Sequence, residues 1–399
     1  MKNLVVNCGS SSLKYQLVDM DGEKVLAKGL VERIGIHGSK IKHSKTGMDS
    51  VSREVDFPTH TDAIRYVFEM LVDETYGAVK SLDEISAVGH RIVHGGWKFT
   101  EPVLVTEEVI KGIEEIIPFA PLHNPAHIQG IRAVQAVLPS LPNVVVFDTA
   151  FHQTMPEEAY VYGLEYKYLE DYHIRKYGFH GTSHNYVSHR AAEMLGKDIK
   201  DLKIVTCHLG NGSSITAVEN GKCVDTSMGF APLEGVLMGT RSGDIDGAAV
   251  VYLSRILGDP DAVSDALQKK GGLLGLSGIS SDLRDVEEAA AAGNPRAQLA
   301  QNKLLYGVKK YIGSYAAAMN GMDVLVFTAG IGENGIAFRE EICNGLSYFG
   351  IKIDSEKNNC RGKEVIISTP DSRVTVMVVP TEEEMMIARD TKRCVENLK

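Results

Sequence analysis

The stretch LVVNCGSSSLKYQLVDMDGEKVLAKGLV, residues 4–31, sets the expectation for the fold. A short apolar run leads into a turn rich in glycine and serine, and an alternating segment from Leu13 to Asp19 follows. Asp21-Gly22 then separates this segment from a second apolar-rich run, Lys24 to Val31. Two such runs on either side of an Asp-Gly pair predict a β-hairpin.

The same order of features returns in IVTCHLGNGSSITAVENGKCV, residues 204–224. The apolar run is again followed by a glycine- and serine-rich turn, a short apolar segment and an Asn-Gly pair at Asn220-Gly221. Turns of small residues are common between strands, so one match would carry little weight. Two matches in the same order predict that the chain contains two copies of one folding unit.

Further apolar runs predict single strands at 85–88, 144–147 and 324–327, and helical spacing appears at 61–72 and 300–319. Strands that alternate with helices predict an α/β fold of two domains, each with a mixed sheet flanked by helices. Clefts between domains are preferred ligand sites. We therefore expect the active site in the interdomain cleft.

Bulk composition excludes several classes of protein. The 399 residues are 44% hydrophobic and 24% charged, which is ordinary for globular domains. The formal net charge of −10 argues against nucleic-acid and membrane-surface partners, since both are polyanions. The amino terminus turns polar too soon for a signal peptide, so we expect a cytoplasmic protein. The six cysteines show no C-x-x-C pair and are expected to be reduced and mostly buried: Cys8, Cys207, Cys223, Cys343, Cys360 and Cys394.

Three turns rich in glycine follow predicted strands: Gly9 to Ser12, Gly210 to Ser214, and Gly330 to Gly335. Glycine lets backbone N–H groups approach an anion closely, and serine adds a donor, so such turns can bind phosphate. The chain has no G-x-x-x-x-G-K-[ST] pattern, which excludes a P-loop enzyme.

The third turn also fits the dinucleotide pattern G-x-G-x-x-G, with Asp354 at a suitable distance for a ribose contact. The motif begins at residue 330 of 399, which leaves too little chain for the remaining strands of a doubly wound domain. We therefore prefer the phosphate-loop interpretation to an NAD site.

Nine segments together resemble the acetate and propionate kinase family, within the superfamily of acetate and sugar kinases, chaperone ATPases and actin. They run in family order along the chain, at residues 7–14, 89–96, 120–125, 147–152, 177–184, 208–214, 238–244, 330–334 and 380–384. The resemblance implies duplicated ribonuclease H-like (actin-like ATPase) domains, 1–148 plus 385–399 and 149–384. It also implies a homodimer that transfers the γ-phosphoryl group of ATP to acetate, giving acetyl phosphate and ADP.

A carboxylate acceptor is already ionised at neutral pH, so catalysis by positioning and charge neutralisation is expected rather than by a general base. The resemblance implies that Arg91 holds the acceptor carboxylate and that Arg241 and His180 contact the transferring group. His123 is implied as a second imidazole donor. Asp148 is implied in catalysis and, with a turn or helix cap as its structural alternative, in binding a metal ion.

The resemblance also implies binding sets. Mg²⁺, with Mn²⁺ as a substitute, would be held by Asn7, Asp148 and Glu383. Thr381 to Glu384 fits a capping box, which assigns Glu384 to the terminal helix. The methyl pocket would be Val93, Leu122, Phe179 and Pro232. The residues implied for ATP are Ser10, Ser12, Lys14, His208, Leu209, Gly210, Asn211, Gly212, Asp282, Leu283, Arg284, Gly330, Ile331, Gly332, Glu333 and Asn334.

Several alternatives stay open from the sequence. Lys14 also fits an exposed strand lysine, and Ser281 or Asp282 also fits a helix cap. A structural role is equally compatible with four histidines in the motifs: His90, His94, His152 and His184. Propionate kinase is the alternative within enzymes, with a butyrate kinase less favoured, and a non-catalytic ATP-binding switch is the alternative outside them.

Overall fold

The structure is a computed structural model that describes residues 1–397. The chain folds into two compact units. The first unit contains residues 1–150 and the chain from Glu382 onward, and the second unit contains Phe151–Thr381. Glu382, Glu383 and Glu384 therefore group with the first unit, whereas the sequence placed them in the second.

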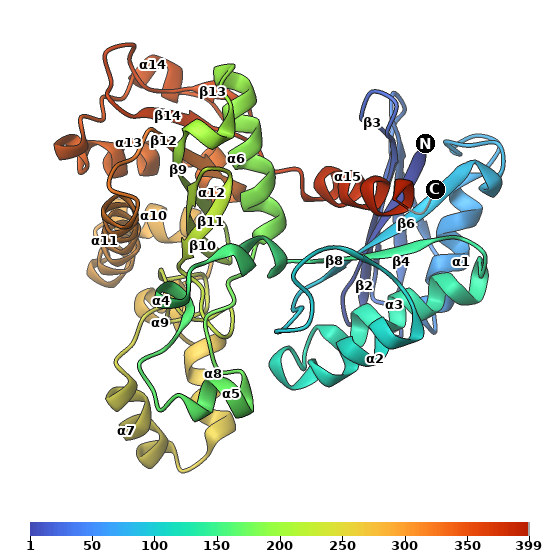
Figure 1. Ribbon diagram of the computed structural model, residues 1–399, viewed down its shortest axis with the longest axis horizontal. Helices are drawn as coiled ribbons and strands as arrows, with labels where there is room; N and C mark the ends of the chain where they lie inside the picture. The colour runs from blue at the N-terminus through green and yellow to red at the C-terminus, as the bar shows by residue number, and fades with distance from the viewer. Residues whose placement is uncertain (398–399) are drawn as a thin grey trace. The chain divides into compact units, whose positions relative to one another are not determined.

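The first unit is built on a mixed sheet with the strand order β5-β4-β3-β2-β1-β6-β8-β7 (Figure 1). The hairpin strands are antiparallel, while β1, β6 and β8 run parallel to one another. The strands are β1 (Lys2–Cys8), β2 (Ser12–Asp19), β3 (Lys24–Glu32), β4 (Lys40–Lys45), β5 (Val51–Glu54), β6 (Ile85–Ile92), β7 (Val103–Leu104) and β8 (Asn143–Phe147).

Helices cover both faces of this sheet. They are α1 (His60–Leu71), α2 (Glu107–Glu115), α3 (Asn124–Val137) and α15 (Glu383–Glu396). α1 begins at a capping box formed by Thr59 and Asp62, and its apolar stripe packs into the core that also contains Leu4 and Val6 of β1. Alternate β1 residues face the other way, and Asn3 donates a hydrogen bond from Nδ2 to the Ala388 carbonyl of α15.

The second unit repeats this plan with the strand order β11-β10-β9-β12-β14-β13. Its strands are β9 (Lys203–Leu209), β10 (Ser213–Glu219), β11 (Lys222–Thr226), β12 (Val324–Thr328), β13 (Val365–Ile366) and β14 (Thr375–Val378). Its helices are α4 (Glu157–Tyr160), α5 (Lys167–Tyr172), α6 (Gly181–Leu195), α7 (Gly247–Leu257), α8 (Pro260–Gln268), α9 (Gly272–Ser277), α10 (Leu283–Ala291), α11 (Pro295–Ala318), α12 (Ala329–Asn334), α13 (Ile336–Asn344) and α14 (Ser355–Asn358).

The sheet of the second unit has one apolar face and one that carries polar side chains. Val205, Cys207 and Leu209 of β9 point into the core that contains α10 and α11. The alternate residues Thr206 and His208 point toward α6 and bond to its side chains. α6 therefore lies on the polar face (Figure 1).

The topologies confirm the predicted duplication. In each sheet, three antiparallel strands are followed by two parallel ones, as β3-β2-β1-β6-β8 and β11-β10-β9-β12-β14. Both predicted hairpins are present, and the turns lie at the expected Asp-Gly and Asn-Gly pairs. The expected α/β fold with two mixed sheets is therefore confirmed.

Two local predictions differ from the structure. Gly330 to Asn334 form the short helix α12 instead of an open turn. Thr381 does not cap the terminal helix, because its hydroxyl donates to Ser183 Oγ at 2.8 Å and Glu382 is the cap residue, without a side-chain bond. The capping-box prediction was wrong because Thr381 has a long-range partner that the local pattern does not contain.

Candidate functional site

In the first unit, polar side chains gather at the carboxyl ends of the parallel strands. Asn7 lies near the end of β1, Arg91 near the end of β6, and Asp148 directly after β8. The strand register places Lys14 opposite Asn7. Ends of neighbouring parallel strands meet at one edge of the sheet, and ligands of open α/β sheets bind there. The register thus brings together residues that the sequence separates by up to 141 positions, from Asn7 to Asp148.

Arg91 and Asp148 form a bidentate ion pair in this cluster. Arg91 donates from Nε to Asp148 Oδ1 at 3.1 Å and from Nη2 to Oδ2 at 2.5 Å. Glu383, at the start of α15, places Oε2 3.8 Å from Arg91 Nε. Burial disfavours the charge of Arg91, but Asp148 and Glu383 more than offset this effect and raise its pKa. Arg91 is therefore a fixed cation.

Glu383 carries the opposite perturbation. Burial raises the pKa of its carboxyl group, and the negative charge of Asp148 adds to this effect, while Arg91 opposes it. Two acidic side chains and the Asn7 amide at one edge supply the oxygen atoms that Mg²⁺ prefers. Within residues 1–397, no group of three or more His, Cys, Asp or Glu side chains is arranged to hold a metal ion. This is compatible with Mg²⁺, which often takes only one or two carboxylates and completes its shell with phosphate and water.

Histidines of the first unit lie beside this cluster. His123 precedes α3, and His127 is buried one turn into the same helix. Burial lowers the pKa of His127 to about 3, and the charges of Arg91 and His123 contribute, which places the three side chains near one another. The sequence did not single out His127, because a histidine inside a helix gives no local signal for a site.

The implied methyl-pocket residues of the first unit differ in burial. Val93, just after β6, is buried, whereas Leu122 is 69% exposed. A side chain so exposed makes few contacts within its own unit. In the second unit, Phe179 is buried and Pro232 is half-buried.

In the second unit, His180 has an unusual backbone conformation. It precedes α6 with φ of +55°, in the left-handed region that few non-glycine residues adopt. His180 Nδ1 lies 2.8 Å from Ser214 Oγ, and its ring stacks on His208 with 4.1 Å between ring centroids. A strained backbone held by side-chain contacts is common at functional sites.

Arg241 lies against the glycine-rich loop at residues 210–214. A Cβ atom placed on Gly212 would be 2.5 Å from Arg241 Nη2 and 3.4 Å from His180 Nε2. Gly212 therefore leaves room for both side chains. Arg241 Nη1 donates to the Pro232 carbonyl at 2.5 Å, which fixes the guanidinium, and burial lowers its pKa.

Asn211 belongs to this loop as well. Its carbonyl accepts a hydrogen bond from Gly239 N at 3.0 Å, and a Cβ atom on Gly239 would overlap the Asn211 side-chain oxygen. This contact ties the loop at residues 210–212 to the segment that carries Arg241.

The two other glycine-rich turns that the sequence predicts to bind phosphate belong to different units. Gly330 lies next to Gly210 in the second unit, since a Cβ atom on Gly210 would be 4.0 Å from Gly330 N. His208, Leu209, Gly210 and α12 are thus neighbours. Glu333 does not face outward, because its carboxylate accepts hydrogen bonds from Ala329 N and Thr381 N. The Gly9 to Ser12 turn belongs to the first unit, where Gly9 N donates to the Ser12 carbonyl.

The remaining ATP candidates have simple local roles in this structure. Asp282 caps α10 by accepting from Arg284 N at 2.9 Å, and it also pairs with the exposed Arg284 side chain. Leu283 is buried in the core. Lys14 is exposed and lines a cavity of about 240 Å³ together with Glu384. Asp354, the residue of the alternative NAD site, caps α14.

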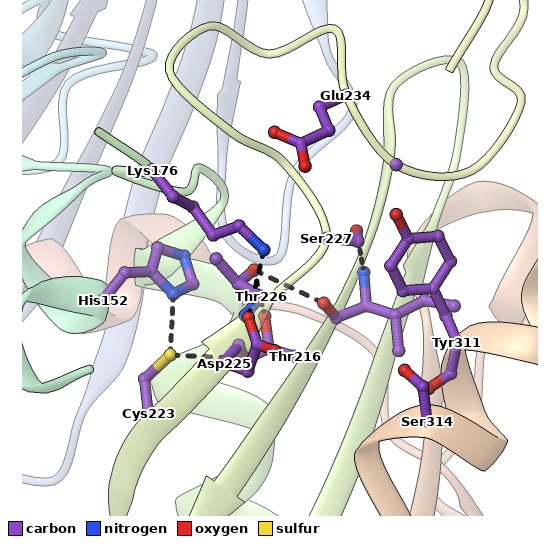
Figure 2. A network of polar contacts seen from close by, with 12 residues as sticks. His152, Lys176, Thr216, Cys223, Asp225, Thr226, Ser227, Glu234, Tyr311 and Ser314 are labelled. Carbon is purple, nitrogen blue, oxygen red and sulfur yellow. Dashed lines mark hydrogen bonds and ion pairs between the residues drawn. The ribbon is translucent and has the colours of Figure 1, made fainter. Parts of the chain in front are cut away.

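Four further histidines have internal partners. His90 Nε2 contacts Asn143 Oδ1 at 2.7 Å, and His94 Nδ1 accepts from Gly96 N at 2.9 Å. His184 bonds to Thr206 and Ser214. His152 contacts Cys223 Sγ at 3.2 Å, as Figure 2 shows, and its Nε2 lies 2.8 Å from the Phe179 carbonyl.

The His152 contacts bear on the site because Phe179 directly precedes His180. Figure 2 shows His152 and Cys223 within a polar network that also contains the ion pair between Lys176 and Asp225, 3.2 Å apart. Burial lowers the pKa of His152 to about 4, so its ring is neutral near pH 7. His152 therefore supports the backbone before His180.

The first unit carries a fixed guanidinium, Arg91, at the ends of its parallel strands, and the second carries Arg241 and His180 beside a glycine-rich loop. Groups of this kind suit phosphoryl transfer. The family model of the Acetokinase family matches residues 2–389. The chain belongs to the Acetokinase family, and it is a kinase.

Individual relatives match this chain over their whole length. Acetate kinase of Thermotoga maritima is 58% identical over all of both chains. Acetate kinase of Caldanaerobacter subterraneus is 59% identical over the same full extent. Among solved structures, acetate kinase of Porphyromonas gingivalis is 51% identical, with a TM-score of 0.94 and 99% of each chain covered. A propionate kinase from Francisella tularensis is 42% identical, with a TM-score of 0.91 over 98% of this chain and 99% of that one.

One structural absence is also relevant. No helix between residues 1 and 397 is both long and apolar enough to cross a membrane.

Proposed function

We propose that the protein transfers the γ-phosphoryl group of ATP reversibly to acetate by direct in-line transfer, giving acetyl phosphate and ADP. The observation that carries the proposal is the convergence of Arg241 and His180 on Gly212, in a chain whose full-length relatives are acetate kinases. A fixed cation and an imidazole donor beside a glycine-rich loop suit the charge that develops on transferring phosphoryl oxygens.

Arg91 holds the acceptor carboxylate in this mechanism. The ion pair with Asp148 uses two of its five N–H groups and sets the plane of the guanidinium. The remaining N–H groups of Nη1 and Nη2 on the end of the guanidinium then suit a second carboxylate, since such a fork matches the two oxygens of that group. Acetate needs no general base because it is ionised at neutral pH. Asp148 therefore orients Arg91 instead of removing a proton.

Arg241 and His180 stabilise the phosphoryl group during transfer, and His123 supplies a further imidazole donor. His208 through Gly212 and Gly330 through Asn334 bind the phosphates of ATP, while Asp282 through Arg284 lie on the adenosine side. Ser10, Ser12 and Lys14 complete the phosphate contacts.

Asn7, Asp148 and Glu383 would hold Mg²⁺, or Mn²⁺ as a substitute. The raised pKa of Glu383 supports this assignment, because a buried carboxyl beside another carboxylate is relieved by a cation. The bound ion would neutralise charge on the ATP phosphates.

The acceptor is a very small acid. Val93 of the first unit and Phe179 of the second are each buried and apolar, which suits contact with a methyl group better than with a longer chain. One methylene in an apolar pocket is worth about 1 to 3 kcal/mol, so propionate should be a measurable but poorer acceptor. Propionate kinase is therefore the second candidate function. The observation that favours it is the structural similarity to the propionate kinase from Francisella tularensis.

We also propose a homodimer in the cytoplasm. α7 has no buried residue, and three of its large apolar side chains lie on the surface: Val251, Tyr252 and Ile256 are 55%, 64% and 62% exposed. Such an apolar surface suits a second copy of the chain. All six cysteines are free, as in a reducing compartment. Sedimentation velocity tests the dimer, and Ile256→Asp should shift the protein toward monomer if α7 is at the interface.

A hydroxamate assay for acetyl phosphate, with ATP, Mg²⁺ and acetate, tests the activity. Acetate-dependent product is expected, whereas slow ATP hydrolysis indifferent to acetate would support a non-catalytic ATP switch instead. Arg91→Ala and Arg241→Ala should each lower kcat by about 10²-fold or more with the fold retained, because each removes charge from the reaction centre. Near-normal turnover in both variants would refute the mechanism.

A further inference from the structure

A chain of buried hydroxyl and imidazole groups runs behind His180. Ser214 Oγ lies 2.8 Å from His180 Nδ1 and 2.7 Å from His184 Nε2. On the other side of the His184 ring, Nδ1 lies 2.7 Å from Thr206 Oγ1. Thr206, His184 and Ser214 are fully buried, so bulk water does not compete for these hydrogen bonds. We call these three residues the Thr206–His184–Ser214 chain.

The proton count at Ser214 links the two imidazole rings. A hydroxyl group has one proton, so Ser214 can donate to only one of the two ring nitrogens. If both nitrogens carried protons, the buried hydroxyl would have no acceptor, because these two rings are the partners of Ser214 Oγ within residues 1–397. The other nitrogen therefore carries its own proton and donates to the hydroxyl oxygen. His180 Nδ1 and His184 Nε2 therefore have opposite protonation, and whichever state His184 adopts decides the tautomer of neutral His180.

Thr206 forms the hydrogen bond on the other side of the His184 ring. Its hydroxyl proton has two possible acceptors: His184 Nδ1 at 2.7 Å and the Thr216 carbonyl at 3.5 Å. The 3.5 Å contact contributes little, and the 2.7 Å contact can be made in either direction, by the hydroxyl or by Nδ1–H. We infer the direction from the proposed role of His180. The proton of neutral His180 lies on Nε2, where it can donate to the phosphoryl group, only if Thr206 donates to Nδ1, His184 donates from Nε2 to Ser214, and Ser214 donates to His180 Nδ1.

The result does not depend on whether His184 is charged. Burial lowers the pKa of His184, and the nearby His152 and His208 add to this effect, so the ring is neutral near pH 7. If it were protonated at both nitrogens, Nε2 would still donate to Ser214. The proton of neutral His180 lies on Nε2 in both cases.

We propose that the Thr206–His184–Ser214 chain is a positioning device that keeps His180 as the neutral Nε2–H tautomer, directed at the phosphoryl group. This rests on the proposed role of His180. Nε2 lies on the side of Gly212, where Arg241 Nη2 also lies, and His208 stacks on the ring. The opposite tautomer would present a lone pair to phosphoryl oxygens and repel them. The three residues act through His180 and do not touch substrate.

Nitrogen NMR of protein labelled with ¹⁵N-histidine tests the tautomer without turnover. The His180 resonances are assigned by their loss in His180→Gln, and the pattern of two-bond couplings to the ring protons distinguishes the tautomers. Near pH 7.5 we expect a neutral ring with the proton on Nε2. A proton on Nδ1, or an even mixture, would overturn the proposal. The expected tautomer in a protein that forms no acetyl phosphate would leave it standing and refute the proposed function.

Removal of the hydroxyl groups tests the link to catalysis. Thr206→Val and Ser214→Ala should each lower kcat about tenfold, the equivalent of one hydrogen bond, and leave the KM for ATP within about twofold. The His180 tautomers should mix in both variants. Thr206→Ser keeps the hydroxyl and should restore the wild-type tautomer and most of kcat.

Matched controls separate this effect from loss of packing. Thr216→Val removes a buried hydroxyl that bonds to Thr226 on the strand paired with β10, and Ser188→Ala removes one on α6 that bonds to the Asn185 carbonyl. Neither hydroxyl is a hydrogen-bond partner of His184. Both controls should keep the tautomer and kcat. Equal losses in controls and test variants, or no loss in Thr206→Val and Ser214→Ala, would contradict the positioning role.

Discussion

Substitution of Gly212 by alanine should disable the protein with little effect on its fold. The new Cβ atom would lie 2.5 Å from Arg241 Nη2, whereas ordinary contacts begin near 3.4 Å, so Nη2 must move by about 0.9 Å (3.4 Å minus 2.5 Å). The same atom would lie 3.4 Å from His180 Nε2, which needs only a slight adjustment. Arg241 thus takes most of the displacement and loses or lengthens its hydrogen bond to Pro232.

A misplacement of about 1 Å at a reacting centre costs on the order of 10²-fold in rate. We therefore expect Gly212→Ala to lower kcat about 10²-fold. Stability should change little, because Gly212 has no positive φ and the atom that must move is the end of a flexible side chain. Steady-state kinetics with acetate and ATP measures the first effect, and thermal unfolding followed by circular dichroism measures the second.

Gly163→Ala is the matched control. Gly163 belongs to the same unit, has no positive φ and would place its Cβ atom more than 4 Å from any other group. This variant should keep both kcat and the unfolding temperature. A Gly212→Ala protein with kcat within about threefold of wild type would show that the position of Arg241 is not critical and would refute the reasoning.

Three more variants test contacts and burial elsewhere in the chain. Val93→Ala should raise kcat/KM for propionate relative to acetate, and an unchanged ratio would remove Val93 from the acceptor pocket. Gly89→Ala places a Cβ atom 2.2 Å from Thr391 Oγ1 and 2.8 Å from Ile387 Cγ2, so it should displace α15. The free energy of unfolding, measured in urea, should fall by about 1 to 3 kcal/mol. Wild-type stability in this variant would argue against the packing of α15 on Gly89. Burial lowers the pKa of His152 from 6.5 to about 4 in the folded state, so its contribution is full above pH 6.5 and falls as the pH drops toward 4, by up to about 3 kcal/mol. Denaturant unfolding at pH 7.5 and 5 should show a smaller loss in His152→Gln than in wild type, and equal losses would assign the pH dependence to other groups.

Local sequence determined the strands and turns near each hairpin. Alternation and the Asp-Gly and Asn-Gly turns act within a few residues, and both hairpins are where the pattern placed them. Helical spacing at 61–72 and 300–319 likewise corresponds to α1 and α11. These features depend on backbone preferences and on burial of one face, which are encoded in neighbouring residues.

Tertiary structure decided which distant side chains meet. Thr381 has the local pattern of a helix cap, yet it bonds to Ser183, 198 positions away. The sequence left open whether His184 has a structural or a functional role. The register of β9 and β10 places Thr206 and Ser214 on either side of its ring, and this shows its partners. Hydrogen-bond partners across a sheet and a helix depend on register and packing, which no short window of sequence contains.

The candidate site divides in the same way. The sequence, through the family it resembles, named Arg91, Asp148, Arg241 and His180. Only the folded chain shows that Asp148 holds Arg91 in a two-point ion pair and that Gly212 leaves the space Arg241 occupies. Residue types are a property of the sequence, whereas the distances that decide their chemistry arise from strands and helices that the chain brings together over long separations.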